Sequence, residues 1–241
     1  MDKIKELQRM IDEVDNIVVF TGAGISTESG IKDFRSKDGI YSVVSEQYKL
    51  RPEYMLSSSF LYNNSTEFYN FYRQNLNCLN IEPNITHKYL KKLEDIGKLK
   101  AIITQNIDGL HCKAGNKLVY EIHGTIYKNY CIKCNKEYDA NYVFNSKSIP
   151  LCKCGALIRP NVVLYGEMLP ESEYNASLLA ISKADLLIII GTSLTVHPAA
   201  GMVNLFDGKY MVIINKNETP FDNKANLVIN EKLSNVFSKL K

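Results

Sequence analysis

One stretch decides the fold: Val18-Val19-Phe20-Thr21-Gly22-Ala23-Gly24-Ile25-Ser26-Thr27-Glu28-Ser29-Gly30. Its apolar start predicts a buried strand, and Gly22 and Gly24 allow a sharp turn with the backbone close to a ligand. The hydroxyl-bearing residues that follow are typical of a helix start. In α/β folds such a strand, glycine turn and helix N-terminus hold phosphate groups. The full dinucleotide motif has a third glycine where this chain has Thr27, so this stretch predicts a nucleotide site without naming the nucleotide.

Length and composition limit the possible classes of function. The chain has 241 residues, enough for one large domain or for a domain with a sizeable insertion. The net charge of +3, with basic residues spread along the chain, argues against a nucleic-acid-binding protein. No apolar run approaches the ~20 residues of a membrane span, and acidic residues interrupt the N-terminal segment, so we expect neither anchor nor signal peptide. We expect a cytoplasmic protein whose six cysteines bind metal or stay free.

Strands that alternate with helices predict a doubly wound parallel sheet. Each expected strand is followed by small or polar residues, and these strand ends are at Gly22, Gln105, His123, Gly191 and Asn215. Because the carboxyl ends of parallel strands meet at one edge, we expect these residues to line a single ligand crevice. At that edge His123 becomes a candidate general base, since imidazole titrates near neutral pH.

Two segments interrupt the alternation of strands and helices. Residues 40–96 are rich in tyrosine and predict a helical insertion whose aromatic side chains form core rather than a ligand site. Within it we expect His87 near the start of a helix, with its ring nitrogens hydrogen-bonded. The polar loop 30–39, which is bounded by glycines and follows the phosphate cradle, is either a lid or an ordinary surface loop.

A four-cysteine pattern predicts a zinc site. Cys131, Cys134, Cys152 and Cys154 have the spacing C-x2-C-x17-C-x-C, and two close pairs at this separation are typical of four-thiolate zinc. In extended backbone, residues i and i+2 point to the same side, so the C-x-C half can face one metal ion. Four thiolates complete the coordination, so we expect a structural ion that supplies most of the stability of its polar lobe.

Two rival functions fit parts of this pattern. A nicotinamide-dependent dehydrogenase would carry the full glycine motif and an acidic residue about 20 positions later, and Thr27 argues against it. A zinc-ribbon nucleic-acid binder would have a basic face around the cysteines. Glu137 and Asp139 dilute the lysines there, and such a module has no need of His123.

The motifs taken together resemble the sirtuins, the NAD-dependent protein lysine deacetylases and deacylases, in their bacterial form. The resemblance spans nearly the whole chain and rests on Gly22-Ala23-Gly24-Ile25-Ser26, Gly30-Ile31 with Asp33-Phe34-Arg35, Gln105-Asn106-Ile107-Asp108, His123-Gly124, the four cysteines, Val162-Val163 with Gly166-Glu167, and Gly191-Thr192-Ser193-Leu194.

The resemblance implies a fold of two lobes. A Rossmann-like NAD-binding domain would comprise residues 1–36, 97–126 and 160–241. A smaller lobe would combine the helical insertion 37–96 with the zinc-binding module 127–159. The enzyme would be a monomer, and NAD and an acyl-lysine peptide or protein would enter the cleft between the lobes from opposite sides.

The resemblance also implies which residues contact NAD, the co-substrate. The glycine loop would cradle the pyrophosphate, Phe34 and Arg35 would belong to a mobile lid over the nicotinamide ribose, and Lys232 would touch adenine through its backbone. The implied contacts are Gly22, Ala23, Gly24, Thr27, Asp33, Phe34, Arg35, Gln105, Asn106, Ile107, Asp108, His123, Gly191, Thr192, Ser193, Asn215 and Lys232.

For the second substrate the resemblance implies a tunnel for acyl-lysine, with the peptide added as a strand between two loops of the enzyme. The implied catalytic residues are His123, Asn106 and Asp108. The acyl oxygen would attack C1′ of the nicotinamide ribose while Asp108 holds the carboxamide, and His123 would then take a proton from the ribose hydroxyls. Free lysine, nicotinamide and O-acetyl-ADP-ribose would be the products. The implied peptide and acyl-lysine contacts are Val163, Leu164, Tyr165, Gly166, Glu167, Leu194 and Val196.

Two alternatives to deacetylation stay open on the sequence. Tyr48-x-x-Arg51 lies roughly where desuccinylating members carry a Tyr/Arg pair for an acidic acyl group. A protein ADP-ribosyltransferase would break the same bond of the cofactor. The C-x-C half of the zinc pattern also departs from the C-x2-C of many members, which leaves the geometry of the metal site to be determined.

Overall fold

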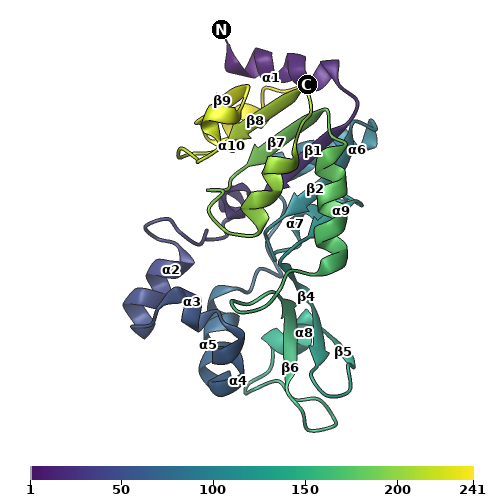
Figure 1. Cartoon of the computed structure of the whole chain (residues 1–241). Helices are drawn as coiled ribbons and strands as arrows, with labels where there is room; N and C mark the ends of the chain where they lie inside the picture. Colours follow the sequence, from purple (N-terminus) through teal and green to yellow (C-terminus); the bar gives the residue numbers. More distant parts are fainter. Residues whose placement is uncertain (1) are drawn as a thin grey trace.

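A computed structural model describes residues 2–241 and shows two lobes (Figure 1). The larger lobe is built on a six-stranded sheet in the order β3-β2-β1-β7-β8-β9, in which every neighbouring pair is parallel. This order confirms the predicted doubly wound sheet and places its switch point between β1 and β7. The strands are β1 (Ile17–Thr21), β2 (Leu99–Thr104), β3 (Val119–Glu121), β7 (Leu186–Ile190), β8 (Tyr210–Ile214) and β9 (Leu227–Ile229).

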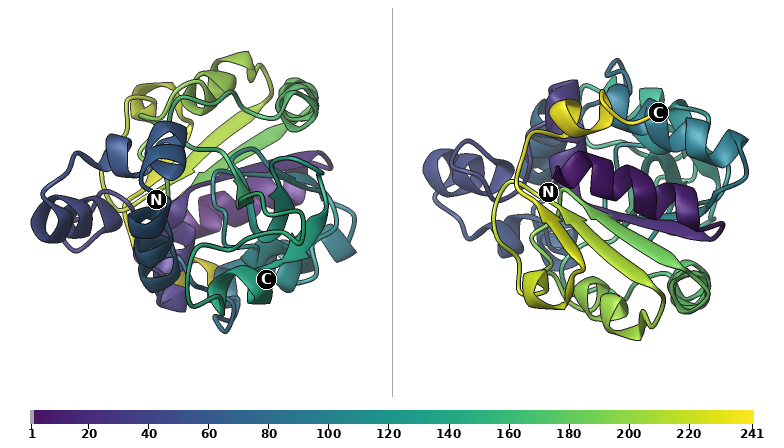
Figure 2. Two further views of the ribbon diagram at one scale, coloured as in Figure 1. Left: turned by 90° about the horizontal axis from the view of Figure 1, so that it is seen from below. Right: turned by 90° about the horizontal axis from the view of Figure 1, so that it is seen from above.

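Helices cover both faces of this sheet, and alternate strand residues pack against different helices. Val19 of β1 belongs to the core shared with α1, α6 and α10, whereas Phe20 belongs to the core shared with α9 and η3. Figure 2 shows α1 and α9 on opposite sides of the strands. Burial on both faces explains why the central strands are apolar throughout. The elements are α1 (Lys3–Glu13), α6 (Ile85–Asp95), α9 (Glu171–Ser182), α10 (Leu233–Phe237) and the 3₁₀ helix η3 (Ala199–Leu205).

The smaller lobe joins two separate segments of the chain around one core. A three-stranded antiparallel sheet in the order β5-β4-β6 packs with the helices of the first insertion, and both contribute to one apolar cluster. Phe68, Tyr69, Phe71 and Tyr72 are buried in that cluster, as the prediction of core aromatic residues requires. The prediction that none of them belongs to a ligand site is wrong for Phe68 and Tyr72, which also line a cavity. The elements are α2 (Ile40–Val43), the π-helical turn η2 (Val44–Tyr48), α3 (Pro52–Met55), α4 (Ser58–Asn63), α5 (Ser65–Asn75), β4 (Gly124–Cys131), β5 (Glu137–Asp139), α8 (Ala140–Phe144) and β6 (Ile158–Val162).

The lobes do not divide at the expected positions. Helix α6 lies within the range 37–96, yet Leu90 and Leu93 pack in the core of the large lobe because the apolar face of α6 covers the parallel sheet. The expected divisions near residues 126 and 160 fall inside β4 and β6, which run without a break from the sheet edge into the small lobe. Three short elements complete the chain: η1 (Ala23–Ser29), α7 (Leu110–Lys113) and η4 (Asp222–Lys224). Across residues 2–241 no helix has the length and apolarity that a membrane crossing requires.

The expectation that His87 is hydrogen-bonded is wrong. Asn84, rather than a later residue, caps α6, accepting from the backbone amides of Thr86 and His87 at 3.0 and 3.4 Å. The His87 ring is fully buried beside His111, with ring centroids 4.8 Å apart, and neither of its nitrogens has a partner among the described residues. Burial lowers the pKa of His87 from 6.5 to about 4, and burial followed by the charge of His87 lowers that of His111 well below 6.5.

This histidine pair predicts a loss of stability in acid. The ring of His87 takes up a proton near pH 6.5 in the unfolded chain but only near pH 4 in the folded chain. The free energy of unfolding is therefore at its full value above pH 6.5 and decreases as the pH is lowered from 6.5 to 4. This pKa shift corresponds to a decrease in the free energy of unfolding on the order of 3 kcal/mol between these two pH values. Urea unfolding at pH 7.5, 6, 5 and 4 should show a steep loss for the wild type and a shallower one for His87→Gln. The exposed His197 provides the control, since His197→Gln should keep the wild-type slope; parallel curves for all three proteins would contradict the prediction.

Candidate active site

A cavity of about 1310 Å³ lies at the carboxyl edge of the parallel sheet, where the two lobes meet. The five strand-end residues expected to converge, Gly22, Gln105, His123, Gly191 and Asn215, all line it. They come from the ends of neighbouring strands in the doubly wound sheet, which brings distant parts of the sequence to one edge. The structure therefore confirms a single crevice at the switch point of the sheet.

The floor of the cavity is formed by two glycine loops packed backbone to backbone. The amide of Gly24 donates to the carbonyl of Gly191 at 2.8 Å. A Cβ on Gly24 would lie 2.7 Å from Gly191 Cα, and Gly191 has a φ of +61°. Larger residues would push the loops apart and fill the space that a pyrophosphate needs. The residues after Gly22 form the 3₁₀ helix η1 rather than an α-helix, with the Thr27 hydroxyl donating to the Gly24 carbonyl at 2.9 Å.

The protonation state of His123 follows from its hydrogen bond. Nδ1 lies 2.9 Å from the backbone carbonyl of Gln105, and a carbonyl can only accept, so Nδ1 carries the proton. Nε2 is then left with its lone pair. Burial lowers the pKa of His123 below 6.5, so the ring is neutral at pH 7. The loop after β2 thus holds a neutral imidazole in one tautomer on the cavity wall, which is the state that the predicted general base requires.

Asp108 lies behind the cavity wall. Its side chain is 6% exposed and is absent from the described lining, whereas Asn106 and Ile107 line the cavity. The carboxylate accepts from the Ser26 hydroxyl at 2.7 Å and from the Leu110 amide at 2.9 Å. The Asn106 amide donates to the same Ser26 hydroxyl at 3.1 Å, which leaves its Oδ1 free to accept. Burial raises the pKa of Asp108. This network fixes Asn106, and a direct contact between Asp108 and a carboxamide stays a prediction.

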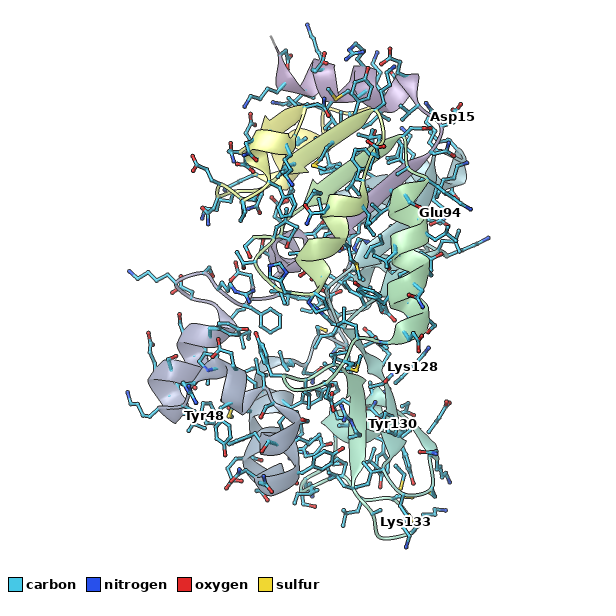
Figure 3. The ribbon with its side chains drawn as sticks, viewed as in Figure 1. Asp15, Tyr48, Glu94, Lys128, Tyr130 and Lys133 are labelled. Carbon is cyan, nitrogen blue, oxygen red and sulfur yellow. The ribbon has the colours of Figure 1, made fainter. Side chains whose placement is uncertain are left out.

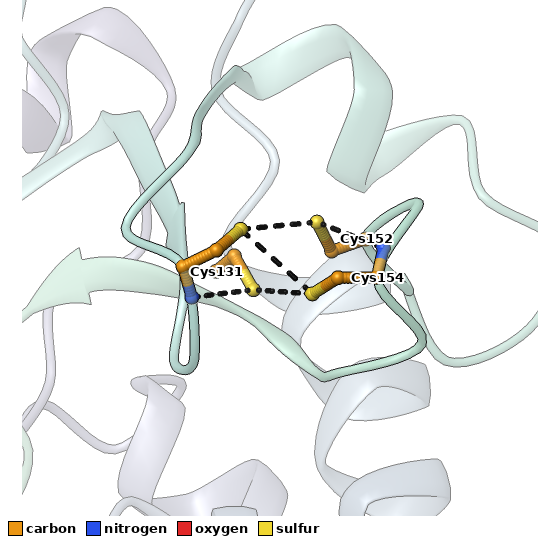
Figure 4. A group of neighbouring side chains, drawn as sticks. Cys131, Cys152 and Cys154 are labelled. Atoms are coloured by element: carbon orange, nitrogen blue, oxygen red, sulfur yellow. Dashed lines mark hydrogen bonds between the residues drawn. The ribbon is translucent and has the colours of Figure 1, made fainter.

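The four cysteines of the pattern meet at the far end of the small lobe (Figure 4). Their sulfur atoms all lie within 4.8 Å of one another, with Cys131–Cys154 at 3.5 Å and Cys134–Cys152 at 3.6 Å. A tetrahedral zinc with Zn–S bonds of 2.3 Å separates its ligands by about 3.8 Å, so the thiols fit that ion. Backbone amides of Lys133 and Cys154 point at these sulfurs, as in turns that stabilise thiolates. The C-x-C half therefore fits the same site as the C-x2-C half.

Comparison with known proteins assigns the chain to a family. The Sir2 family model matches residues 22–198, which contain the glycine loops, His123 and all four cysteines. The chain belongs to the Sir2 family, the sirtuins.

Its similarity to individual sirtuins extends over almost the whole length. An NAD-dependent protein deacetylase of Clostridium acetobutylicum is 49% identical over 238 residues, which cover 98% of this chain and 97% of the relative. A solved Sir2 complex with p53 peptide and NAD+ superposes with a TM-score of 0.88 at 38% identity, covering 98% and 96% of the two chains. A Sir2 complex with the inhibitor EX-527, 2′-O-acetyl-ADP-ribose and deacetylated p53 peptide superposes with a TM-score of 0.86 at 38% identity and the same coverage.

In this sirtuin, all but one of the further predicted cofactor contacts lie on the cavity, the exception being Asp108. Among the predicted substrate contacts, Leu194, which was expected to pair with the peptide backbone, does not line the cavity. Its backbone has a φ of +53°, and its side chain is 2% exposed in the core beneath η3. The other predicted residues on the cavity are Ala23, Gly24, Thr27, Asp33, Phe34, Arg35, Asn106, Ile107, Val163, Leu164, Tyr165, Gly166, Glu167, Thr192, Ser193, Val196 and Lys232.

The loop that carries the predicted peptide contacts is held from both sides. The amide of Val163 donates to the carbonyl of His123 at 2.9 Å, and the amide of Tyr165 donates to the carbonyl of Leu56 at 3.0 Å. Glu167 pairs with Arg159 and accepts from the Leu164 amide at 2.9 Å. The Glu167 carboxylate thus closes the turn. Its predicted pairing with the peptide would therefore use its backbone rather than its side chain.

Sequence reasoning missed several residues of the wall in this sirtuin. Asn84 is one of them: besides capping α6, its amide donates to the Ile25 carbonyl at 2.7 Å and to the Ser29 hydroxyl at 3.0 Å, fixing η1. Its place before the helix-starting Thr86 was the only available signal. The apolar lining residues had no such signal in the sequence, because they have the same pattern as core residues. Missed lining residues include Tyr41, Leu56, Phe68, Tyr72, Leu76, Leu169 and His197.

The Tyr48/Arg51 pair does not reach the cavity among the residues that the structure describes. Tyr48 lies on the outer helical part of the small lobe (Figure 3), where its ring packs edge-on against Phe71 at 5.6 Å. The small lobe instead contributes uncharged side chains to the wall, among them Leu56, Phe68, Tyr72 and Leu76. The hypothesis of a succinyl-binding pair at Tyr48 and Arg51 therefore has no support in the geometry.

Proposed function

We propose that this sirtuin removes acetyl groups from protein lysines with NAD as co-substrate, and that His123 is its general base. The curated relatives are NAD-dependent protein deacetylases, and the solved relatives hold deacetylated peptide together with O-acetyl-ADP-ribose. The observation that carries the proposal is the free Nε2 of a neutral His123 in a cavity shared by a glycine cradle and an apolar wall.

The residues present fit NAD. The paired glycine loops at Gly24 and Gly191 leave room for the pyrophosphate. Gln105 donates to the Thr192 hydroxyl at 2.9 Å, which fixes both side chains at the edge where ribose hydroxyls would lie. Asn215 lines the cavity after β8, on the side proposed for adenosine.

Each polar group then has a separate task. When bound, NAD supplies a glycosidic bond whose cleavage releases nicotinamide. Asn106 offers a free carbonyl oxygen to a ribose hydroxyl or an ordered water, because Ser26 takes up its amide. His123 accepts the ribose proton at Nε2 while Gln105 holds the ring, which allows the ribose oxygen to attack the acyl carbon. The apolar wall at Val163 and Leu164 excludes competing water.

The wall predicts a preference for uncharged acyl groups. A succinyl carboxylate placed among Leu56, Phe68 and Leu76 would lose its hydration, and none of these three side chains carries a positive charge to offset that loss. We expect kcat/KM for a succinyl-lysine peptide to be at least about 100-fold below that for the acetyl-lysine peptide of the same sequence, a difference of roughly 3 kcal/mol. A butyryl-lysine peptide controls for length. A succinyl rate within tenfold of the acetyl rate would refute the assignment of this wall.

Mass spectrometry of the products tests the function itself. With NAD and an acetyl-lysine peptide, the enzyme should yield equal amounts of deacetylated peptide, nicotinamide and O-acetyl-ADP-ribose. A peptide that gains ADP-ribose and keeps its acetyl group would favour the transferase alternative. NAD consumption without any change in the peptide would reject both. The monomeric state, the cytoplasmic location and the absence of nucleic-acid partners stay predictions from the sequence.

A further inference from the structure

We propose that the hydroxyl groups of Tyr41 and Tyr165 form a latch that holds the lid of residues 33–39 closed against the acyl-lysine wall before NAD binds. The two hydroxyls are hydrogen-bonded to each other although they lie 124 positions apart in the sequence. Both side chains line the cavity. The role in catalysis rests on the proposed function, whereas the latch itself can be observed without any substrate.

Tyr41 is the residue onto which the lid folds. Its backbone amide donates to the Phe34 carbonyl at 3.0 Å. Its ring meets the ring of Phe34 edge-on at 6.0 Å, and the Arg35 guanidinium lies 5.2 Å from the ring centroid. The two lid residues expected above the nicotinamide ribose are thus packed on one tyrosine, so a displacement of Tyr41 displaces both.

Tyr165 is fixed by its backbone to another part of the cavity wall. Its amide donates to the Leu56 carbonyl at 3.0 Å, and its carbonyl accepts from the Ser58 amide at 3.1 Å. These bonds anchor it to the small-lobe helices, while the neighbouring Val163 is tied to the backbone of His123. A bond from Tyr41 to Tyr165 therefore joins a loop with few other tertiary hydrogen bonds to the rigid wall of the site.

The expected consequence is preorganisation. A lid that is held in place before NAD arrives loses less conformational freedom on binding. One such hydrogen bond changes an equilibrium by about two- to tenfold. We expect Tyr165→Phe, which keeps the ring and deletes the hydroxyl, to raise the KM for NAD by that factor.

Limited proteolysis tests the latch without substrates. Arg35 and Lys37 are exposed trypsin sites within the lid. Cleavage of the ligand-free protein at these sites should be about two- to tenfold faster in Tyr165→Phe, since the rate follows the open fraction of the loop. Tyr41→Phe should give the same increase, and the double variant no more than either single change, because all three lack the same bond.

A matched control is available in the small lobe. Tyr142 is an exposed tyrosine whose hydroxyl donates to the Leu151 carbonyl at 2.9 Å, far from the lid. Tyr142→Phe should leave both the lid cleavage rate and the KM for NAD at their wild-type values. Unchanged lid cleavage in Tyr165→Phe, additive single changes, or a lower KM for NAD would each overturn the latch. An inactive wild type would overturn the proposed function and leave the cleavage result standing.

Discussion

Replacement of His123 with alanine should reduce deacetylation by about 10² to 10⁴-fold, the contribution of a general base. The reason is geometric: Gln105 holds the Nδ1 proton, so Nε2 is the only nitrogen of that ring available to accept a proton. NAD should still bind, because the glycine loops and Thr192 are unchanged. Steady-state kinetics with an acetyl-lysine peptide, together with calorimetric titration of NAD, measure the two effects separately.

A second variant distinguishes lost chemistry from lost structure. In His123→Asn the side-chain amide can still donate to the Gln105 carbonyl, but it has no basic nitrogen at the position of Nε2. We expect His123→Asn to be as inactive as His123→Ala while it retains the wild-type melting temperature to within a few degrees. If either variant kept more than about a tenth of wild-type kcat/KM, His123 would not be the base.

Loss of the metal should unfold the small lobe and abolish deacetylation. Structural zinc sites contribute about 10–16 kcal/mol of apparent binding free energy, which exceeds the usual stability of a domain. Cys131 and Cys152 share one core with Val162, Leu164 and Leu56. We therefore expect the proposed acyl-lysine wall to depend on the metal through this shared core.

The measurement compares Cys152→Ser with a cysteine outside the cluster. Wild type should contain about one zinc per chain, and Cys152→Ser should contain little zinc, melt at a lower temperature and lack activity. Cys112 is exposed and lies outside the four-thiol site, so Cys112→Ser should match the wild type in all three respects. A zinc-depleted protein with full activity and an unchanged melting temperature would show that the cysteines do not support the wall.

Much of the site could be predicted because its residues follow strands in the sequence. Gly22, Gln105 and Gly191 stand at the ends of apolar runs, and the rule that parallel strands end at one edge was enough to bring them together. The cysteine spacing was similarly sufficient for the metal site. The assignment of α6 to a lobe was harder to predict, because the apolar face of an amphipathic helix does not indicate which sheet it will cover.

Residues that act through distant contacts could not be predicted in this way. Asp108 sits in a motif that suggests a ligand contact, but its carboxylate accepts from Ser26 and it is not among the lining residues of the cavity, so the contact stays a prediction. Tyr48 and Arg51 have a suggestive spacing, but neither is among the residues that line the cavity. The buried, unpaired nitrogens of His87 have no sequence signal either, since burial is a property of the packed core.

For this protein the sequence by itself predicted the doubly wound parallel sheet, the paired glycine loops and the cluster of four cysteines, because each depends on local pattern and on the fixed geometry of parallel strands. It also placed His123, the proposed general base, at the same edge of the sheet. The tertiary structure decided which apolar side chains form the acyl wall, which tautomer His123 adopts, and that Tyr41 meets Tyr165. Those features depend on contacts between segments far apart in the chain, and a pattern read along the chain carries no information about such distances.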